Sequence, residues 1–295
     1  MKITLEDVVQ DKTSGSLQVS QNALIVLKNY ISGYTNEAEE EFIQTVAAMG
    51  KELISAHPML VLVRKRVSNV IAYLKRIAKS EKSFQDVRRF TIQKIDEIMT
   101  NAVQIRKKIG EYGAKLITNG NKIITISSSD ILKEIFLSAH KSRKKFEVFC
   151  LESRPMLEGQ KFAEMLAKEG ISVHVYTDAT MGHLVRGANI VMAGTDRFYD
   201  DGIINKMGTY PLAATAQKNN VPFYISGETD KVLKEIDKSV RFRAHSAAEV
   251  FSPKVKSVKV SNFYFEIVEY DYITKIVCEE GIYQTEDFIN WYIKD

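Results

Sequence analysis

Apolar residues in the first part of the chain recur at the spacing of amphipathic helices. The pattern predicts four helices, and we expect Gly110 and Gly113 to mark the end of the last one. No alternation typical of strands interrupts residues 1–113, so a helical bundle is the expected structure of this part. The expected helices cover residues 17–31, 37–55, 58–80 and 84–109.

From Lys122 onward, short apolar runs alternate with helical stretches, which indicates βαβ units and a parallel sheet. The expected fold class is therefore α/β, with an N-terminal helical domain (residues 1–113) and a C-terminal Rossmann-like parallel-sheet domain (residues 114–295). The expected strands are 122–126, 146–151, 172–176, 189–193 and 222–226, and the expected helices are about 130–142, 158–169, 180–186 and 206–218. The tail adds an apolar stretch at 263–268, a strand at 273–278 and a helix at 286–292.

The segment 187–226 is the most informative part of the chain. We interpret it as two buried strands, with a polar loop at 198–204 and a helix that opens at Asn205 and Lys206. Ligands of open α/β sheets bind beyond the carboxyl ends of the strands, where this loop is expected. The helix N–H groups and Lys206 are suited to a phosphate, and Asp196 to a proton or a hydroxyl.

Composition and charge change this picture little. The chain has 295 residues, of which 45% are hydrophobic and 26% charged, which suits two globular domains. A net charge of +4 is too small to indicate nucleic-acid binding. Basic residues gather within 64–108, while the last thirty residues are mostly acidic. Solvated helix faces are the favoured interpretation of the basic clusters, and a surface for an acidic partner is the alternative.

The cysteine pattern indicates no metal site. Cys150 and Cys278 each lie in an apolar, strand-like run, so we expect buried free thiols in a reducing compartment. We expect no metal and no cofactor. The sequence shows no signal peptide and no apolar run near the length of a membrane span, so a cytoplasmic protein without membrane attachment is expected.

Three polar loops are expected at one edge of the sheet, which is typical of a pocket for a small ligand. They contain Ser127 to Asp130, Glu152 to Pro155, and the residues around Asp196. Each has a structural alternative: the serine run caps a helix, Arg154 braces a loop through Glu152, and Asp196 pairs with Arg197. For His183, at the pocket edge, a packing role is favoured over catalysis.

Residues 151–185 and 189–226 closely resemble the translation initiation factor 2B α/β/δ-like family. That family also contains 5-methylthioribose-1-phosphate isomerase and archaeal ribose-1,5-bisphosphate isomerase. The resemblance covers residues 120–230, and more loosely the tail around 262–266. It implies a helical domain followed by a Rossmann-like domain.

The resemblance implies specific site residues. The isomerases move protons with a cysteine, from a Thr-His-Cys-Asn motif, and with the aspartate of a Gly-(Ala/Thr)-Asp-Arg motif. Asp196 matches that aspartate, and the ligand-binding positions are matched by the residues Arg154, Gly194, Asn205 and Lys206.

Two departures weaken the case for isomerisation. Thr125, Ile126, Ser127 and Ser128 replace the Thr-His-Cys-Asn motif, so Ser127 stands at the position of the catalytic thiol. A thiol has a pKa of about 8.5, whereas the pKa of an alcohol lies several units higher, so a serine exchanges protons poorly at neutral pH. An early Arg-Gly-Ala phosphate-binding segment is also missing. Cys150 is no substitute, since it lies within a strand.

Two hypotheses therefore stand. The first is a non-catalytic relative of the regulatory subunits of translation initiation factor 2B, with a retained sugar-phosphate or nucleotide pocket. The second is a sugar-phosphate isomerase that uses Asp196 with an unusual acid. The resemblance implies a homodimer or higher oligomer through the C-terminal domain, and the α subunit of initiation factor 2 as a protein partner.

Overall fold

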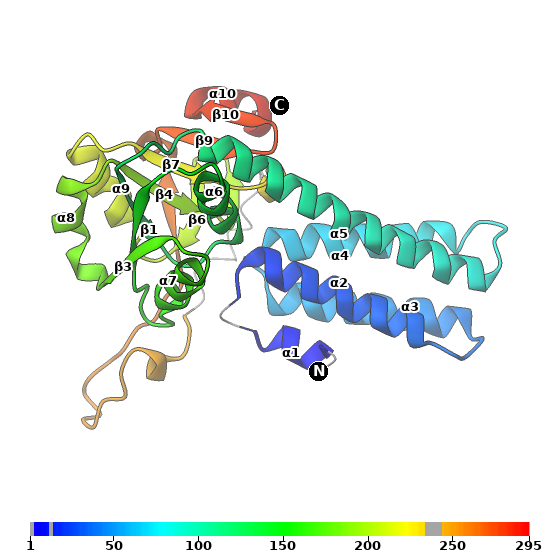
Figure 1. Ribbon diagram of the computed structural model, residues 1–295. Helices are drawn as coiled ribbons and strands as arrows, with labels where there is room; N and C mark the ends of the chain where they lie inside the picture. Colours follow the sequence, from blue (N-terminus) through cyan, green and yellow to red (C-terminus); the bar gives the residue numbers. More distant parts are fainter. Residues whose placement is uncertain (1–2, 12–13, 234–243, 295) are drawn as a thin grey trace. The chain divides into compact units, whose positions relative to one another are not determined.

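The computed structural model describes residues 3–11, 14–233 and 244–294, and divides into two compact units, residues 1–105 and 106–295. Figure 1 shows helices in the first unit and a sheet with helices in the second. The predicted α/β class, with an N-terminal helical part and a C-terminal parallel sheet, is confirmed. The predicted boundary after residue 113 stays a prediction.

The first unit is built from amphipathic helices around a core of aliphatic residues and Phe42. Leu24, Leu27 and Ile31 on α2, with Val67 on α4, are fully buried, as their spacing predicts. The short helix α1 was not predicted; Thr4 caps it. The helices are α1 (Leu5–Val9), α2 (Ser16–Gly33), α3 (Glu39–Ala56), α4 (Val61–Ile77) and most of α5 (Phe84–Ala114).

The prediction that Gly110 and Gly113 end the last helix was wrong, because α5 passes through both and ends at Ala114. A Cβ atom at Gly113 would lie 2.5 Å from Ile135 Cδ1, and one at Gly110 would lie 2.6 Å from Glu134 Cγ. The glycines therefore let α5 approach the helix α6 (Asp130–Lys141) closely.

Some of the basic residues within 64–108 have structural roles. Arg66 is buried, and its guanidinium donates a hydrogen bond to Ser20 Oγ at 2.8 Å. Arg88 donates to the carbonyl oxygen of Ile31 at 3.0 Å. Among the described residues, no helix is long and apolar enough to cross a membrane.

The second unit contains a mostly parallel sheet in the order β10-β9-β7-β4-β1-β2-β3. The chain proceeds from β1 outward through β2 to β3, then returns to β4 on the other side of β1. The first five predicted strands are confirmed, and two of them match to the residue; the sixth, expected at 273–278, is β9 of the same sheet. The strands are β1 (Asn121–Ile126), β2 (Phe146–Leu151), β3 (Ser172–Tyr176), β4 (Ile190–Gly194) and β7 (Phe223–Ser226).

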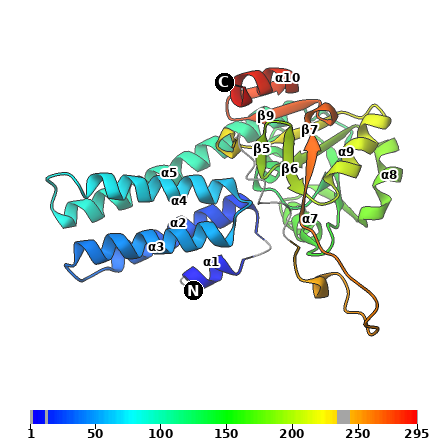
Figure 2. The same ribbon diagram turned by 180° about the vertical axis from the view of Figure 1, so that it is seen from behind.

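Helices cover both faces of this sheet. Figures 1 and 2 show α6 and α7 (Glu158–Lys168) on one face, and α8 (Met181–Leu184) and α9 (Thr209–Lys218) on the other. The expected helix at 180–186 is a series of short turns around α8. The alternation of apolar runs and helices predicted this arrangement, because successive crossovers share one hand.

The prediction of a loop at 198–204 was wrong. The strands β5 (Arg197–Tyr199) and β6 (Gly202–Lys206) form a hairpin there, and β8 (Phe265–Glu269) pairs with β6 to make a second, three-stranded sheet. Asn205 and Lys206 therefore lie on a strand, and the helix α9 begins only at Thr209. Burial of Ile203 and Ile204 stabilises the hairpin.

The tail extends the parallel sheet by two strands, β9 (Lys275–Cys278) and β10 (Gly281–Gln284). The pairing of β10 with β9 is antiparallel, and β10 was not predicted. The predicted final helix consists of α10 (Thr285–Phe288), followed by a π-helical turn at Ile289–Ile293.

Gly159 provides a test of the packing of α7 on β2. A Cβ atom there would lie 1.8 Å from the carbonyl oxygen of Leu151, a backbone atom that cannot move alone. We expect Gly159→Ala to lower the free energy of unfolding by about 2 kcal/mol or more, as overpacking does. The control is Gly182→Ala on α8, where a Cβ meets nothing within 4 Å. Chemical denaturation measures both variants, and equal stabilities would contradict the packing argument.

Candidate functional site

The candidate site lies where the order of the strands in the sheet reverses. The chain leaves β1 toward β2 and leaves β4 in the opposite direction, so the loops after β1 and β4 diverge. Such a switch point is where open α/β sheets bind ligands. Extending the register places Ser127, just after β1, level with Gly194 at the end of β4.

The loop after β1 is tied to the loop after β2. Ser127 has a left-handed backbone conformation, with φ of 65°, and its N–H donates to Ser153 Oγ at 2.7 Å. Ser129 Oγ accepts a hydrogen bond from the N–H of Leu132 at 3.3 Å, so the expected helix cap is confirmed.

The loop after β2 is held by a carboxylate from the turn after β3. Asp178 accepts hydrogen bonds from the N–H groups of Ser153, at 2.8 Å, and Arg154, at 2.7 Å. The guanidinium of Arg154 donates to the carbonyl oxygen of Val250 at 3.1 Å. Arg154 therefore has the bracing role that was expected as the alternative to ligand binding. Its partner is the carbonyl oxygen of Val250, and not Glu152 as expected.

The end of β4 packs tightly against these loops. A Cβ atom at Gly194 would lie 2.9 Å from Ser129 Oγ, so this position admits only glycine without movement of its neighbour. Asp196 is half-buried, and its N–H donates to the carbonyl oxygen of Ile204 at 2.9 Å. These contacts bring Gly194 and Asp196 to the same edge of the sheet as Ser127.

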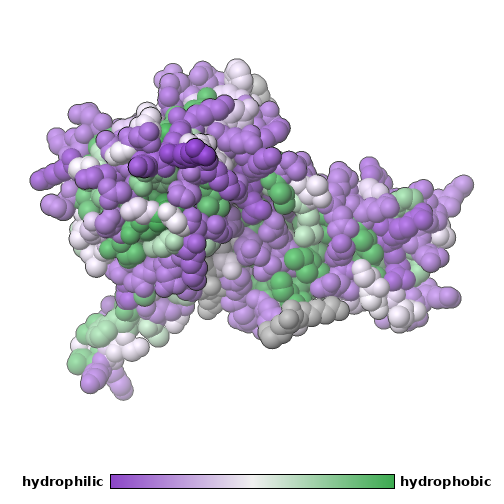
Figure 3. Space-filling view, in the orientation of Figure 1, coloured by the Kyte–Doolittle hydropathy of each residue, from purple (hydrophilic) through white to green (hydrophobic). Residues whose placement is uncertain are grey.

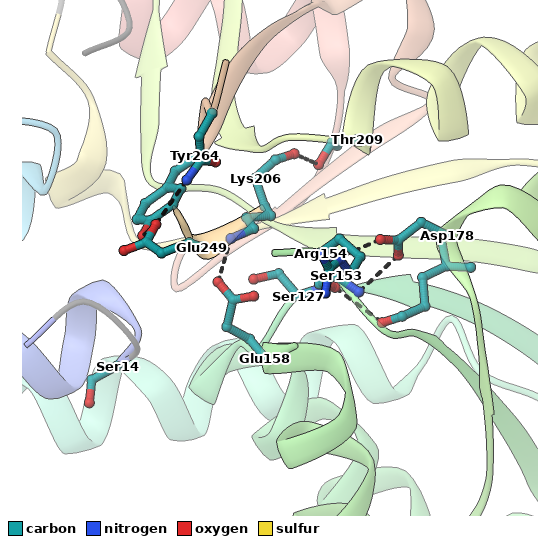
Figure 4. Close-up of polar contacts among 12 residues, drawn as sticks. Ser14, Ser127, Ser153, Arg154, Glu158, Asp178, Lys206, Thr209, Glu249 and Tyr264 are labelled. Atoms are coloured by element: carbon teal, nitrogen blue, oxygen red, sulfur yellow. Dashed lines mark hydrogen bonds and ion pairs between the residues drawn. The ribbon is translucent and has the colours of Figure 1, made fainter. Parts of the chain in front are cut away.

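A buried ion pair lies within this site. Lys206, on β6, and Glu158, at the start of α7, are only 4% and 8% exposed, and Lys206 Nζ lies 2.5 Å from Glu158 Oε1. Glu158 Oε2 is buried and has no hydrogen-bond partner among the described residues. Figure 4 shows the side chain of Ser127 pointing toward this pair. The predicted phosphate-binding lysine is therefore already neutralised by a carboxylate.

A second carboxylate occupies the N-terminus of α9. Glu266 Oε1 accepts hydrogen bonds from the N–H groups of Gly208, at 2.5 Å, and Tyr210, at 2.9 Å. Burial raises the pKa of Glu266, and these N–H groups oppose that shift. The prediction that these helix N–H groups take a phosphate has to be corrected, because a side chain of the protein fills their place.

Asn205 is turned toward the protein interior. Its Nδ2 donates to Thr209 Oγ1 at 3.0 Å, and Thr209 Oγ1 donates to the carbonyl oxygen of Lys206 at 2.6 Å. Both side chains are buried. Asn205 therefore fixes the turn from β6 into α9.

Besides its ion pair with Glu158, Lys206 contacts an aromatic ring. The ammonium group lies 4.7 Å from the centre of the Tyr264 ring, and the ring of His245 stacks on Tyr264 at 3.6 Å. A ring stacked so closely fills one face of Tyr264, so Lys206 occupies the opposite face. The Tyr264 hydroxyl donates to Glu249, and burial, followed by this hydrogen bond, raises the pKa of Tyr264.

The sequence did not single out Glu158, Glu266 or Tyr264. Glu158 had the pattern of an ordinary acidic residue in the first turn of a helix, and Glu266 lay in an apolar stretch far along the chain. Only the pairing of β6 with β8 and the packing of α7 bring them to Lys206 and α9.

The cysteines and His183 are not part of the group of polar residues around Lys206. Cys150 and Cys278 are buried free thiols, as predicted, and burial raises their pKa values to about 12 and about 11. His183 is exposed on α8, so the favoured packing role was wrong. Among the described residues, no group of three or more His, Cys, Asp or Glu side chains is arranged to hold a metal ion.

Comparisons with known proteins identify the family. The sequence profile of the initiation factor 2 subunit family matches residues 12–285. The chain is 28% identical to the ribose 1,5-bisphosphate isomerase of Methanocaldococcus jannaschii, over 99% of this chain and 94% of that protein. It is 34% identical to a putative translation initiation factor eIF-2B subunit 2-like protein of Pyrococcus horikoshii, over 63% of this chain and 66% of that protein.

Solved structures agree with this assignment. The crystal structure described as the Pyrococcus horikoshii translation initiation factor eIF-2B has a TM-score of 0.79 to this chain and 25% sequence identity, and the alignment covers 94% of each chain. With the helical part, the mostly parallel sheet and the profile match over nearly the whole length, the chain belongs to the initiation factor 2 subunit family.

Proposed function

We propose that this chain is a non-catalytic, regulatory-subunit-like member of the initiation factor 2 subunit family, whose pocket binds a small phosphorylated ligand as an effector. The observation that carries the proposal is the buried pair between Lys206 and Glu158. In this proposal the protein is cytoplasmic and forms oligomers through its second unit, and the α subunit of initiation factor 2 is a candidate partner.

The energetics of the pair argue against tight binding of a sugar phosphate. A phosphate that takes Lys206 leaves the Glu158 carboxylate buried without its counter-ion. Removing one partner of a buried ion pair typically costs about 3–5 kcal/mol, which corresponds to a loss of roughly 100-fold or more in affinity. Glu266 likewise competes for the N–H groups of α9. The site is therefore suited to weak, reversible binding.

Proton transfer is the second argument. Ser127 supplies an alcohol where the isomerase relatives are expected to use a thiol, and Cys150 is buried with its pKa raised to about 12. Neither group exchanges a proton readily near neutral pH.

The second candidate function is sugar-phosphate isomerisation of the ribose-1,5-bisphosphate or methylthioribose-1-phosphate type. It is favoured by the isomerase of Methanocaldococcus jannaschii, which is similar over 99% of this chain, and by the aspartate retained as Asp196. In this alternative Asp196 transfers the proton with an acid other than a thiol, and Arg154, Gly194, Asn205 and Lys206 bind the substrate.

Incubation with ribose 1,5-bisphosphate or methylthioribose 1-phosphate distinguishes the two functions. We expect no ketose product, together with a saturable rise in melting temperature as ligand is added, because a ligand that binds only the folded state stabilises it. Turnover that disappears in Asp196→Asn would reject the non-catalytic function and establish the isomerase.

The variant Glu158→Gln tests the competition for Lys206. Because the carboxylate no longer neutralises the lysine, we expect affinity for ribose 1,5-bisphosphate to rise by about tenfold or more in calorimetric titration. Glu164→Gln, an exposed position on the same helix, is the matched control and leaves affinity unchanged. Equal affinity in wild type and Glu158→Gln would show that the ion pair does not limit binding.

The thiols provide a separate measurement. Attack on a disulfide reagent requires the thiolate, and burial both shields the sulfur atoms and raises their pKa values. We therefore expect neither Cys150 nor Cys278 to react with such a reagent in the folded protein at pH 8, and both to react in denaturant. Rapid reaction of Cys150 in the native protein would make it a candidate acid for the isomerase alternative.

A further inference from the structure

A cavity of about 390 Å³ lies in the second unit, where the end of α5 meets α6. It is separate from the candidate site, because α6 begins beside Gly194 at that site and has its last turn at the cavity. The length of α6 puts about 18 Å between its two ends. Figure 3 shows strongly hydrophilic surface where Figure 1 draws α6. A cavity of this size is typical of sites for small ligands.

A glycine brings the two walls of the cavity together. A Cβ atom at Gly110 on α5 would lie 2.6 Å from Glu134 Cγ and 3.0 Å from Ser138 Oγ, both on α6. Glu134 and Ser138 are half-buried and line the cavity. Neither side chain has a hydrogen-bond partner within the described part of the chain. The carboxylate can therefore accept, and the serine hydroxyl can donate or accept, hydrogen bonds from the hydroxyl groups of a ligand.

Four lysines line the same cavity. They are Lys107, Lys115, Lys141 and Lys144. Lys144 has a structural role, because its ammonium group donates to the carbonyl oxygens of Ala114 and Ile117, both at 2.7 Å. These carbonyl groups lie at and just after the end of α5. Lys144 therefore caps α5, and the other three lysines remain at the opening.

Helix capping does not account for Lys141, which lies in the last turn of α6. Lysines are common there because they interact with the last carbonyl groups of a helix. At the end of α6 the backbone serves this purpose: Arg143 takes the left-handed conformation, with φ of 59°, and the N–H of Lys144 donates to the carbonyl oxygen of Ala139 at 3.2 Å. The side chain of Lys141 is left for another role.

The three lysines at the opening carry charge that the protein hardly neutralises. Among the residues described, neither Lys115 nor Lys141 forms an ion pair, and both are exposed. The ammonium group of Lys115 lies 4.8 Å from the centre of the Tyr112 ring. Lys107 lies 4.0 Å from Glu111 in an exposed pair, which contributes little to stability. Three ammonium groups at one opening attract an anion, and lysine is a frequent ligand of phosphate.

We propose that this cavity is a ligand site in its own right and that it binds a phosphorylated polyol. Lys115 and Lys141 bind the phosphate, and the polyol hydroxyl groups form hydrogen bonds with Glu134 and Ser138. An inorganic anion uses the lysines but is repelled by the Glu134 carboxylate, and an uncharged sugar gains nothing from the lysines, so both bind more weakly. This inference does not depend on the proposed function of the pocket at Lys206.

A thiol introduced by Ser142→Cys reports binding at this place. Ser142 is exposed and lines the cavity, whereas Cys150 and Cys278 are buried. We expect glucose 6-phosphate, at about ten times its dissociation constant, to slow alkylation of the introduced thiol by iodoacetamide about tenfold, since only the ligand-free protein reacts. Glucose and inorganic phosphate are expected to protect only at higher concentration. No protection by glucose 6-phosphate, or equal protection by either control compound, would overturn the proposal.

Charge reversal at the opening tests the lysines, with Ser142→Cys retained as the reporter. We expect Lys115→Glu/Lys141→Glu to weaken binding of glucose 6-phosphate by about tenfold or more, because charge-assisted hydrogen bonds are replaced by repulsion. The matched control is Lys161→Glu/Lys168→Glu, which changes two exposed lysines on α7 and gives the same net charge. This control is expected to bind like the parent, with circular dichroism showing that both variants fold. Equal weakening in the control would reject the proposal.

The variant Arg154→Ala separates this cavity from the candidate site. It changes the candidate site and leaves the lining of the cavity intact. We expect protection of the introduced thiol to persist in this variant, whether or not the pocket at Lys206 binds a ligand. Loss of protection in Arg154→Ala would place glucose 6-phosphate in the candidate site and would overturn the proposal.

Discussion

The buried ion pair between Lys206 and Glu158 is the constraint on which the site depends. It joins β6 of the three-stranded sheet to the first turn of α7, and its two residues are 48 positions apart in the chain. Two buried charges of opposite sign are tolerated because their mutual attraction offsets the cost of removing each from water. The pair therefore fixes where the hairpin of β5 and β6 lies relative to the larger sheet, and it sets the charge that any ligand meets.

A carboxylate lies at each of the two expected anion-binding positions, Lys206 and the N-terminus of α9. Glu158 neutralises the lysine, and Glu266 accepts the N–H groups at the start of α9. The geometry of a sugar-phosphate pocket is thus retained while its positive potential is largely offset from within. A protein can keep the fold of an enzyme family in this way and change what its site does, because function depends on a few side chains.

The larger sheet was predictable because its signals are local. The runs 146–151 and 172–176 match β2 and β3 to the residue, since a buried parallel strand is a short apolar run between polar loops. The hairpin of β5 and β6 was missed because Asp200, Asp201 and Gly202 have the composition of a loop. The third strand of this smaller sheet, β8, follows about sixty residues later, so no local sequence pattern predicts that it pairs with β6.

The amino-acid sequence by itself determined the fold class, the loops after β1 and β2 at the carboxyl edge of the sheet, and the serine at the position of a thiol. These follow from periodicity and from residue identity, which need no knowledge of distant contacts. Only the tertiary structure decided that Lys206 is neutralised, that the N-terminus of α9 is filled, and that the side chain of Arg154 is held by Val250. Each of these depends on residues far apart in the chain that folding brings within hydrogen-bond distance.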